Sequence, residues 1–171
     1  MHVDFRKEDL IKSGKSWRFN EEHFDFVVSC LGLGCPWISP ELWAVKGQLF
    51  ILEGFPEWGQ DILKTEHFLI PLPDAHVLAG STYEREFEHV ETDSDGYNII
   101  TGEILPEHLK NIRIISSRAG IRPTTHDRRP VIREIEKGLF AINGLGSKGV
   151  CLAPYAADLI TRMIFPEESA H

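Results

Sequence analysis

The chain has 171 residues, of which 42% are hydrophobic and 26% are charged. This balance is typical of a soluble globular protein and argues against a disordered, fibrous or membrane chain, and the length suits one domain or two small lobes. Aspartate and glutamate total 26 against 18 lysines and arginines, so the formal net charge is −8. Such a charge repels phosphate backbones and disfavours binding to nucleic acid.

The cysteines and the N-terminus predict where the protein resides. Cys30, Cys35 and Cys151 are an odd number in a chain that lacks the composition of a disulfide scaffold. No stretch reaches the roughly 18 apolar residues of a membrane helix, and residues 1–8 alternate in charge where a signal peptide is apolar. We therefore expect a cytoplasmic protein with free thiols. Cys30 and Cys35 have a spacing that zinc accepts, but no second pair accompanies them, so we predict no metal site.

The first half of the chain predicts mostly strands. Residues 8–15 are expected to form a short helix, and the apolar, β-favouring residues 24–30 predict a buried strand that ends in a glycine turn. Further strands are predicted over residues 45–52, 67–72 and 76–80. Proline and aspartate between the last two favour a hairpin, and the succession of strands suggests an antiparallel sheet.

The second half alternates polar and apolar segments. The acidic residues between 84 and 103 predict a solvated loop or an exposed helical face. We then expect a helix over 103–110, strands over 111–117 and 138–143, and a helix over 150–165 with helical apolar spacing. Together these elements predict a mixed α+β chain.

A glycine loop lies between the last predicted strand and helix. Residues 144–149 match G-x-G-x-x-G, but a Rossmann unit needs a second parallel strand, and the roughly 22 residues that follow are too few for it. No lysine with a following serine or threonine completes a phosphate-binding P-loop. The free N–H groups of Gly149, Val150 and Cys151 would favour an anionic or electron-rich group. A plain glycine turn before a helix is the alternative.

Residues 119–132 and 138–154 resemble the C-terminal flavin-binding segment of the D-amino-acid oxidase (DAO) family of FAD-dependent oxidoreductases. That family includes glycine and sarcosine oxidases and the oxidoreductase domain of the tRNA methylaminomethyl-uridine enzyme. Lys46-Gly47-Gln48 resembles the family's strand into the substrate domain, residues 80–84 a later strand, and residues 27–32 the strand beneath the flavin. The resemblance therefore covers nearly the whole chain, in the family's order.

This resemblance implies an α+β fold with an antiparallel substrate-domain sheet and the C-terminal strand, loop and helix of an FAD-binding domain. The implied division is residues 1–40 as a remnant of the FAD-binding domain, 41–117 as the substrate domain and 118–171 as the C-terminal FAD-binding segment. The family's N-terminal Rossmann βαβ unit has no counterpart in the sequence. We therefore expect a truncated chain, the C-terminal portion of such an enzyme, whose full FAD site requires that missing region.

The family's activity implies oxidation of an amine or amino acid by hydride transfer to flavin N5. Arg122 matches the arginine that grips the substrate carboxylate through two parallel bonds, although an arginine paired with Asp127 or another carboxylate is the alternative. Lys148 would stabilise negative charge at flavin N1 and O2, and the hydroxyl of Tyr83 would orient a ligand. Solvent exposure of Lys148 and simple packing of Tyr83 are the structural alternatives. The resemblance implies cofactor contacts from Gly32, Gly144, Gly146, Ser147, Lys148, Gly149 and Val150.

The sequence is therefore compatible with two classes of function. The first is a flavoenzyme whose partners are a small-molecule amine or amino acid and an N-terminal Rossmann half. The second is a non-catalytic binding or interaction module derived from a truncated flavoprotein, whose exposed apolar face binds a partner or a second copy. We expect no membrane partner, and the net charge gives a nucleic-acid partner no support.

Overall fold

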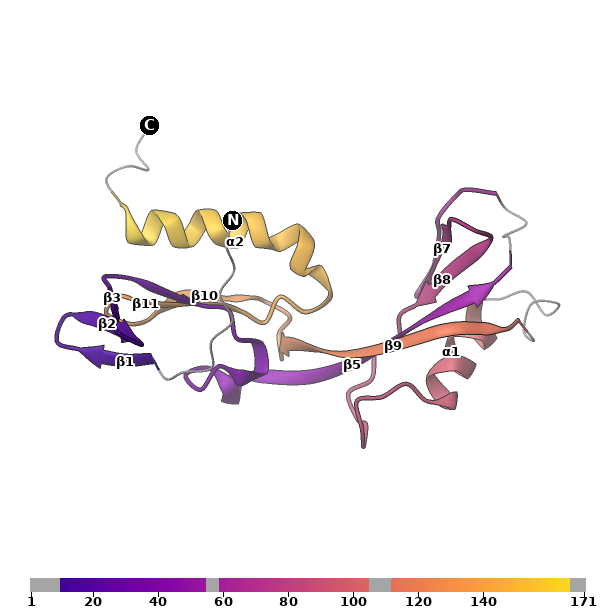
Figure 1. The fold of residues 1–171 in the computed structure, drawn as a ribbon, viewed down its shortest axis with the longest axis horizontal. Helices are drawn as coiled ribbons and strands as arrows, with labels where there is room; N and C mark the ends of the chain where they lie inside the picture. The colour runs from indigo at the N-terminus through magenta and orange to yellow at the C-terminus, as the bar shows by residue number, and fades with distance from the viewer. Residues whose placement is uncertain (1–9, 55–58, 105–111, 167–171) are drawn as a thin grey trace. The chain divides into compact units, whose positions relative to one another are not determined.

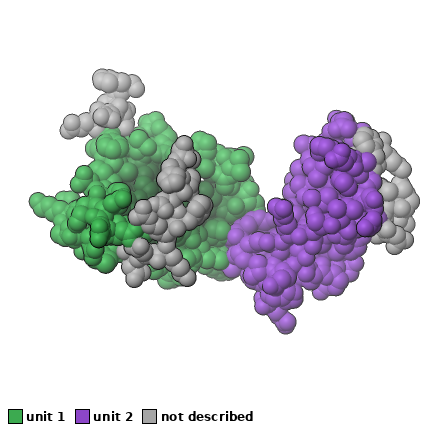
Figure 2. Space-filling view, viewed as in Figure 1, with its two compact units in different colours: residues 1–43, 123–171 green, residues 44–122 purple. Residues whose placement is uncertain are grey.

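The computed structural model describes residues 10–54, 59–104 and 112–166. The chain divides into two compact units, residues 1–43 with 123–171 and residues 44–122 (Figure 2). Within the described ranges, neither helix has the length and apolar character needed to span a membrane. The elements in chain order are β1 (Leu10–Ser13), β2 (Ser16–Phe19), β3 (Glu22–Phe24), β4 (Val27–Ser29), η1 (Gly32–Gly34), η2 (Ser39–Glu41), β5 (Leu42–Glu53), β6 (Leu63–Lys64), β7 (Phe68–Leu72), β8 (His76–Gly80), α1 (Ser94–Ile104), β9 (Ile114–Thr125), β10 (Val131–Glu136), β11 (Leu139–Asn143), η4 (Gly146–Lys148) and α2 (Gly149–Ile164) (Figure 1).

The first unit holds two three-stranded sheets and helix α2. Strands β1, β2 and β3 form an antiparallel sheet. In the other sheet β11 lies in the centre, antiparallel to β10 and parallel to β4. Helix α2 packs against β10 and β11 (Figure 1). The predicted strand, glycine loop and helix at the end of the chain are thus confirmed.

Helix α2 is attached through one apolar stripe. Ala156 and Ile160 are buried, and residues four apart lie on the same face of a helix. Residues that adjoin the second sheet form a compact core of Cys35, Ile38, Leu42, Val131 and Ala141. Burial of Ala156 and Ile160 holds helix α2 beside β10 and β11.

The second unit is a five-stranded sheet with helix α1, and its strand order is β6-β7-β8-β5-β9. Strands β7 and β8 form the predicted antiparallel hairpin, with Leu72 opposite His76. Asp74 and Ala75 between them have φ angles of 61° and 56°, a conformation that aspartate tolerates better than most residues. The fold is therefore mixed, with antiparallel sheets in both units.

The core of the second unit follows the two-residue period of its strands. Phe50 and Leu52 on β5 and Val77 and Ala79 on β8 are buried, because alternate residues share one face of a sheet. Ile100 of α1 and Leu69 of β7 complete the cluster. The ring of Tyr97 on α1 meets Phe50 edge-on, with 5.7 Å between ring centroids.

Several predicted elements differ from the observed ones. The helix over 8–15 is wrong for its described part, because Leu10–Ser13 forms β1 and a two-residue turn follows, in which Gly14 has a φ of 64°. The single strand over 24–30 is two strands, β3 and β4, separated by Asp25 and Phe26.

Two further predictions concern the middle of the chain. Part of the acidic segment forms helix α1, which begins at Ser94, while the predicted helix over 103–110 lies outside the described residues beyond Ile104. The strand predicted over 111–117 is the longer β9, which extends to Thr125.

The buried core of the second unit predicts a large effect of truncation. Leu52 is fully buried, so we expect Leu52→Ala to lower the free energy of unfolding by about 2–5 kcal/mol through lost burial and an unfilled cavity. Ile62 is 62% exposed, and we expect Ile62→Ala to cost less than about 0.5 kcal/mol. Urea unfolding followed by far-ultraviolet circular dichroism measures both. Equal effects of the two substitutions would contradict this core.

Candidate functional site

The glycine loop of the first unit is shaped by close contacts. Gly144 and Gly146 have φ angles of 67° and 54°, a region that other residues rarely adopt. A Cβ atom on Gly144 would come within 2.8 Å of Cγ2 of Thr125, and one on Gly146 within 3.2 Å of Oγ1 of Thr124. Conformation therefore favours glycine at both positions, and space also requires it at Gly144, so two residues of this loop leave the backbone without a side chain.

Asn143, at the end of β11, ties this loop to another glycine turn. Its Nδ2 donates to the carbonyl oxygen of Gly32 at 2.9 Å, and its Oδ1 accepts from the backbone N–H of Gly144 at 2.8 Å. Gly32 also has a positive φ, of 58°. The predicted site residues Gly32 and Gly144 are thus brought together by a buried asparagine that sequence reasoning missed. Its signal was a polar residue that ends an apolar strand directly before a glycine.

The N-terminus of α2 has no side-chain cap and is exposed in its first turn. Lys148 at its N-cap makes no side-chain capping bond, and Val150 in the first turn is 93% exposed. Ser147 and Lys148 are exposed as well. The first N–H groups of a helix have no partner within the helix and favour an anionic or electron-rich group. This part of the loop therefore suits the electron-rich edge of a bound group.

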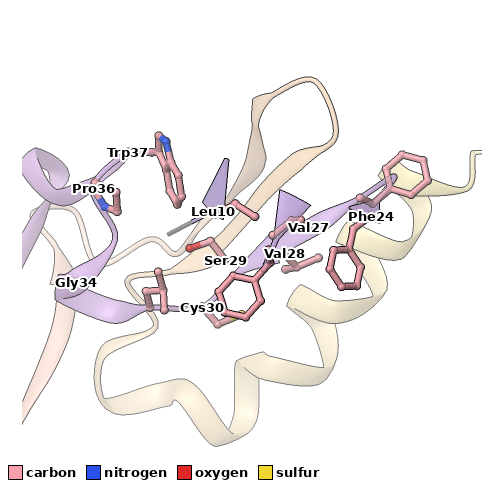
Figure 3. Close-up of a pocket in the computed structure, with 12 residues that line it drawn as sticks. Leu10, Phe24, Val27, Val28, Ser29, Cys30, Gly34, Pro36 and Trp37 are labelled. Atoms are coloured by element: carbon pink, nitrogen blue, oxygen red, sulfur yellow. The ribbon is translucent and has the colours of Figure 1, made fainter. Parts of the chain in front are cut away.

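An apolar groove lies beside β4 in the same unit (Figure 3). It has a volume of about 720 Å³ and is lined mainly by apolar side chains, among them those of Phe24, Phe26, Val28 and Trp37. Strand β4 pairs with β11 on one edge, and within the described ranges no strand pairs with its other edge. An exposed strand edge beside apolar side chains is a typical surface for association.

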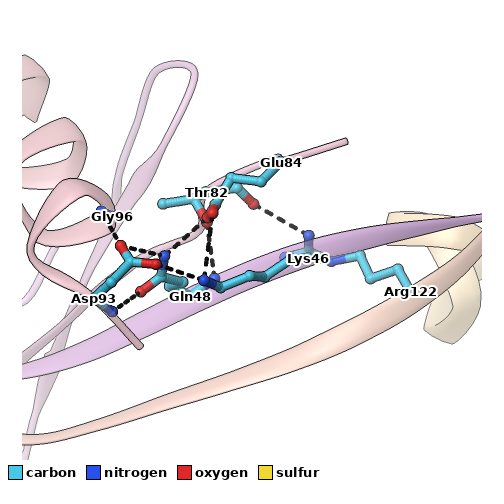
Figure 4. Close-up of polar contacts among 7 residues, drawn as sticks. All are labelled: Lys46, Gln48, Thr82, Glu84, Asp93, Gly96 and Arg122. Carbon is cyan, nitrogen blue, oxygen red and sulfur yellow. Dashed lines mark hydrogen bonds and ion pairs between the residues drawn. The ribbon is translucent and has the colours of Figure 1, made fainter. Parts of the chain in front are cut away.

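A buried polar cluster, which we call the Lys46 cluster, lies in the second unit. It consists of Lys46, Gln48, Thr82, Glu84 and Asp93 (Figure 4). The side chain of Lys46 is only 1% exposed, and its Nζ lies 2.5 Å from Oδ2 of Asp93 and 3.6 Å from Oε2 of Glu84. The hydrogen bond to Asp93 raises the pKa of Lys46 above its ordinary value, against the opposing effect of burial. The amine is therefore a buried, charged structural group.

Asp93 connects this cluster to helix α1. Its Oδ1 accepts from the backbone N–H of Gly96 at 2.8 Å, which is the bond of an N-cap aspartate, and from Nε2 of Gln48 at 3.0 Å. The backbone N–H of Asp93 in turn donates to Oε1 of Gln48 at 2.9 Å. Hydrogen bonds from Gln48, then Lys46, then Gly96 hold the pKa of Asp93 well below its usual range. Two acidic residues of the segment predicted to be solvated, Glu84 and Asp93, thus form part of a buried cluster.

The same cluster aligns two backbone segments. Lys46 and Glu84 exchange two backbone hydrogen bonds, of 2.8 and 2.9 Å. One step along, the N–H of Gln48 donates to Oγ1 of Thr82 at 2.9 Å, and the N–H of Thr82 donates to the carbonyl oxygen of Gln48 at 3.3 Å. Residues 82–84 are therefore held against β5 by side chains as well as by backbone.

Arg122, on β9, contacts the segment that the cluster holds. Its Nη1 donates to the carbonyl oxygen of Thr82 at 3.1 Å and its Nη2 to Oγ of Ser81 at 2.7 Å. Burial lowers the pKa of this guanidinium, and nearby Tyr83 and Glu84 partly offset that effect. Among the described residues no carboxylate lies within ion-pair distance of Arg122. The half-buried charge thus has only neutral acceptors, an arrangement suited to an anionic ligand.

The remaining predicted residues have simpler surroundings. Asp127, the alternative partner for Arg122, lies 4.0 Å from Nε of Arg129 instead. The ring of Tyr83 is exposed and lies 6.0 Å from Cζ of Arg85. Lys148 is exposed in the first unit. The structure thus groups Gly32, Gly144 and Gly146 in one unit, and Tyr83 and Arg122 in the other.

Comparison with known proteins assigns the family. The model of the family described as FAD dependent oxidoreductase (DAO) matches residues 3–163. The chain therefore belongs to the DAO family of FAD-dependent oxidoreductases.

Individual relatives agree with this assignment. The chain is 29% identical to the glycine oxidase of Pseudomonas putida over 92% of its own length and 41% of that protein. It is 25% identical to the tRNA 5-methylaminomethyl-2-thiouridine biosynthesis bifunctional protein MnmC of Idiomarina loihiensis, over 68% of its own length and 20% of that protein. The chain thus spans less than half the length of either relative.

Solved structures share the fold. The glycine oxidase from Geobacillus kaustophilus superposes with a TM-score of 0.75 and 20% identity, over 95% of this chain and 48% of that structure. The glycine oxidase from Bacillus cereus gives a TM-score of 0.72 and 17% identity, over 91% and 47%. The described architecture is therefore similar to about half of a glycine oxidase chain.

The low pKa of Asp93 predicts a dependence of stability on pH. Because its folded pKa lies below the ordinary value of about 3.9, the ionised group contributes stability that is present above pH 4 or so and is lost as the pH falls further. We expect Asp93→Asn to lower stability at neutral pH and to flatten the fall of stability between about pH 4 and pH 2. Urea titrations at a series of pH values measure this.

Asp95 provides a matched control, because it lies in the first turn of the same helix and is exposed. Asp95→Asn should retain the steep loss of stability in acid. If Asp93→Asn shows the same acid dependence as the unaltered chain, the carboxylate of Asp93 does not carry the stabilisation assigned to it.

Proposed function

We propose that this chain forms part of an FAD-dependent oxidoreductase that oxidises a small amine or amino acid bearing a carboxylate. The observation that carries the proposal is the half-buried guanidinium of Arg122, whose acceptors among the described residues are all neutral, in a chain of the DAO family. A guanidinium binds a carboxylate through two parallel hydrogen bonds, which orients the substrate as well as holding it.

The glycine loop fits a flavin. Gly144 and Gly146 have positive φ angles, and Gly144 has no room for a Cβ, so the loop backbone is bare at both positions. The N-terminus of α2 has no side-chain cap and would supply backbone donors. Bound FAD would supply the hydride acceptor, at N5, for the hydrogen on the α-carbon of the substrate. The residues proposed to hold it are Gly32, Gly144, Gly146, Ser147, Lys148, Gly149 and Val150.

Three side chains have proposed roles in the reaction. In this proposal Arg122 binds the substrate carboxylate. Tyr83 is exposed and near enough to Arg122 to affect its pKa, and its hydroxyl would orient the ligand. Lys148 follows the glycine turn, and beside a bound flavin its positive charge would stabilise the negative charge that the cofactor gains on reduction. The helix N-terminus acts in the same direction.

The proposed enzyme also needs a second part, the N-terminal dinucleotide-binding half. The chain covers 41% of the Pseudomonas putida glycine oxidase, and β4 has an edge that no strand pairs among the described residues, next to the apolar groove. In this proposal residues 1–40 and 118–171 belong to the cofactor-binding domain and residues 41–117 to the substrate domain. Family membership supports an enzyme over a non-catalytic interaction module.

Absorbance spectroscopy tests the proposal. The chain is mixed with FAD, alone and with an N-terminal dinucleotide-binding half supplied separately, and the visible absorbance band of the flavin is followed. We expect weak or no binding by the chain alone, and a perturbed band that bleaches anaerobically with an amino acid in the two-part assembly. An assembly that neither perturbs the band nor bleaches with any amine or amino acid would refute the proposal.

Arg122→Lys gives the site-specific prediction. Loss of the paired hydrogen bonds should raise the KM for a carboxylate-bearing amine by roughly 10–100-fold, and leave an amine without a carboxylate nearly unaffected. Arg118→Lys, an exposed position on the same strand, is the matched control and should leave the KM unchanged. Steady-state kinetics of the assembled enzyme separate the two variants, and an equal KM for Arg122→Lys and the parent would contradict the carboxylate role.

A further inference from the structure

The guanidinium of Arg122 occupies the space of a missing side chain. A Cβ atom built on Gly47 would lie 2.1 Å from Nη2, 2.2 Å from Nη1 and 2.3 Å from Cζ of Arg122. Non-bonded carbon atoms do not approach other heavy atoms this closely, so any side chain at position 47 would displace the guanidinium. The arginine conformation seen here depends on glycine at a residue distant in sequence.

The requirement for glycine at this position is one of space. Gly47 is not among the glycines with a positive φ, and it lies in the middle of β5, where glycine weakens a strand relative to other residues. Gly120, on the neighbouring strand β9, differs in this respect, because a Cβ there would meet no atom within 4 Å. Conformation therefore gives no reason for Gly47, whereas the position of Arg122 does.

The two residues beside Gly47 also help to position the guanidinium of Arg122. Successive side chains of a strand point to opposite faces, so Lys46 and Gln48 project to the face opposite to that of position 47. Both are buried in the Lys46 cluster, at 1% and 0% exposure (Figure 4). Through Gln48 the cluster holds Thr82, whose carbonyl oxygen accepts from Nη1 of Arg122. Residues 46–48 thus have two roles. Lys46 and Gln48 belong to the cluster that holds Thr82, and Gly47, on the opposite face, leaves room for the guanidinium of Arg122.

We propose that Gly47 is a positioning residue for carboxylate recognition, because it leaves the space in which Ser81 and Thr82 hold the Arg122 guanidinium. Two of the five N–H donors of the arginine are used in these bonds, so the contacts of the described residues leave 5 − 2 = 3 donors for a ligand. The inference rests on the proposed function for its ligand, a carboxylate-bearing amine. Position 47 then sets specificity, since a side chain there moves the charge and reduces the preference for carboxylates.

The first measurement concerns the chain by itself and needs no cofactor. In ¹⁵N NMR spectra of the arginine side chains, a guanidinium held by two hydrogen bonds shows slow exchange of its protons with water. We expect Gly47→Ala to speed this exchange for Arg122 at least roughly tenfold, and Gly120→Ala to leave it unchanged. Unchanged exchange in folded Gly47→Ala would overturn the inference.

A second variant keeps the test decisive if Gly47→Ala does not fold. Ser81→Ala removes only the hydroxyl that accepts from Nη2 of Arg122 and leaves the backbone acceptor of Thr82 in place. Faster proton exchange at Arg122 in Ser81→Ala supports the hydrogen bonds by which Ser81 and Thr82 hold the guanidinium. Exchange as slow as in the parent would overturn it.

The assembled enzyme supplies the readout of specificity. We expect Gly47→Ala to raise the KM for a carboxylate-bearing amine at least roughly tenfold with a change in kcat below about threefold, while Gly120→Ala matches the parent. A KM unaltered in Gly47→Ala but raised in Arg122→Lys would overturn the role of Gly47 and leave the proposed function intact. A KM unaltered in both variants would instead refute carboxylate binding by Arg122, even where NMR shows that Gly47 positions it.

Discussion

The second unit is organised around the buried ammonium group of Lys46. A charge that is 1% exposed is costly unless it is paired and hydrogen-bonded, and here Asp93 and Glu84 provide the pairing. Asp93 also caps helix α1 and bonds Gln48, so one carboxylate joins the helix to strand β5. The segment that bonds Arg122 is held to the same strand. Electrostatic compensation of one lysine therefore underlies both the local fold and the geometry of the candidate substrate site.

Sequence patterns predicted the parts of the fold that depend on local signals. Pro73 and Asp74 predict the hairpin of β7 and β8. The spacing of apolar residues and the glycines of residues 144–149 predict the strand, loop and helix at residues 139–164. Other elements depended on tertiary contacts. The sequence predicts that the acidic segment is solvated, whereas Asp93 is bonded to Lys46 of β5. This contact forms only when β5 folds beside the segment, so the local sequence does not reveal it. The turn at Gly14 was missed because charged and apolar residues around it suited either a helix or a hairpin.

The candidate site was predictable to a different degree in each unit. The glycine loop is predicted by its G-x-G-x-x-G pattern. The bond from Asn143 to Gly32 is not, because the local signal, a polar residue at the end of an apolar strand, does not reveal a partner 111 residues away. The role of Arg122 was predicted from resemblance to a family. Membership of that family is shown, and the role of Arg122 stays a prediction. Its dependence on Gly47 emerges only from coordinates, because it concerns the space that a side chain would occupy.

A double-mutant cycle between Lys46 and Asp93 tests the central claim most directly. Asparagine can still cap α1, so Asp93→Asn removes mainly the charge, and Lys46→Met removes the ammonium group while keeping an unbranched chain. The account predicts that Asp93→Asn lowers the free energy of unfolding strongly when Lys46 is present and much less in the Lys46→Met background. An equal effect of Asp93→Asn in both backgrounds would show that the two groups are not coupled and would contradict the account.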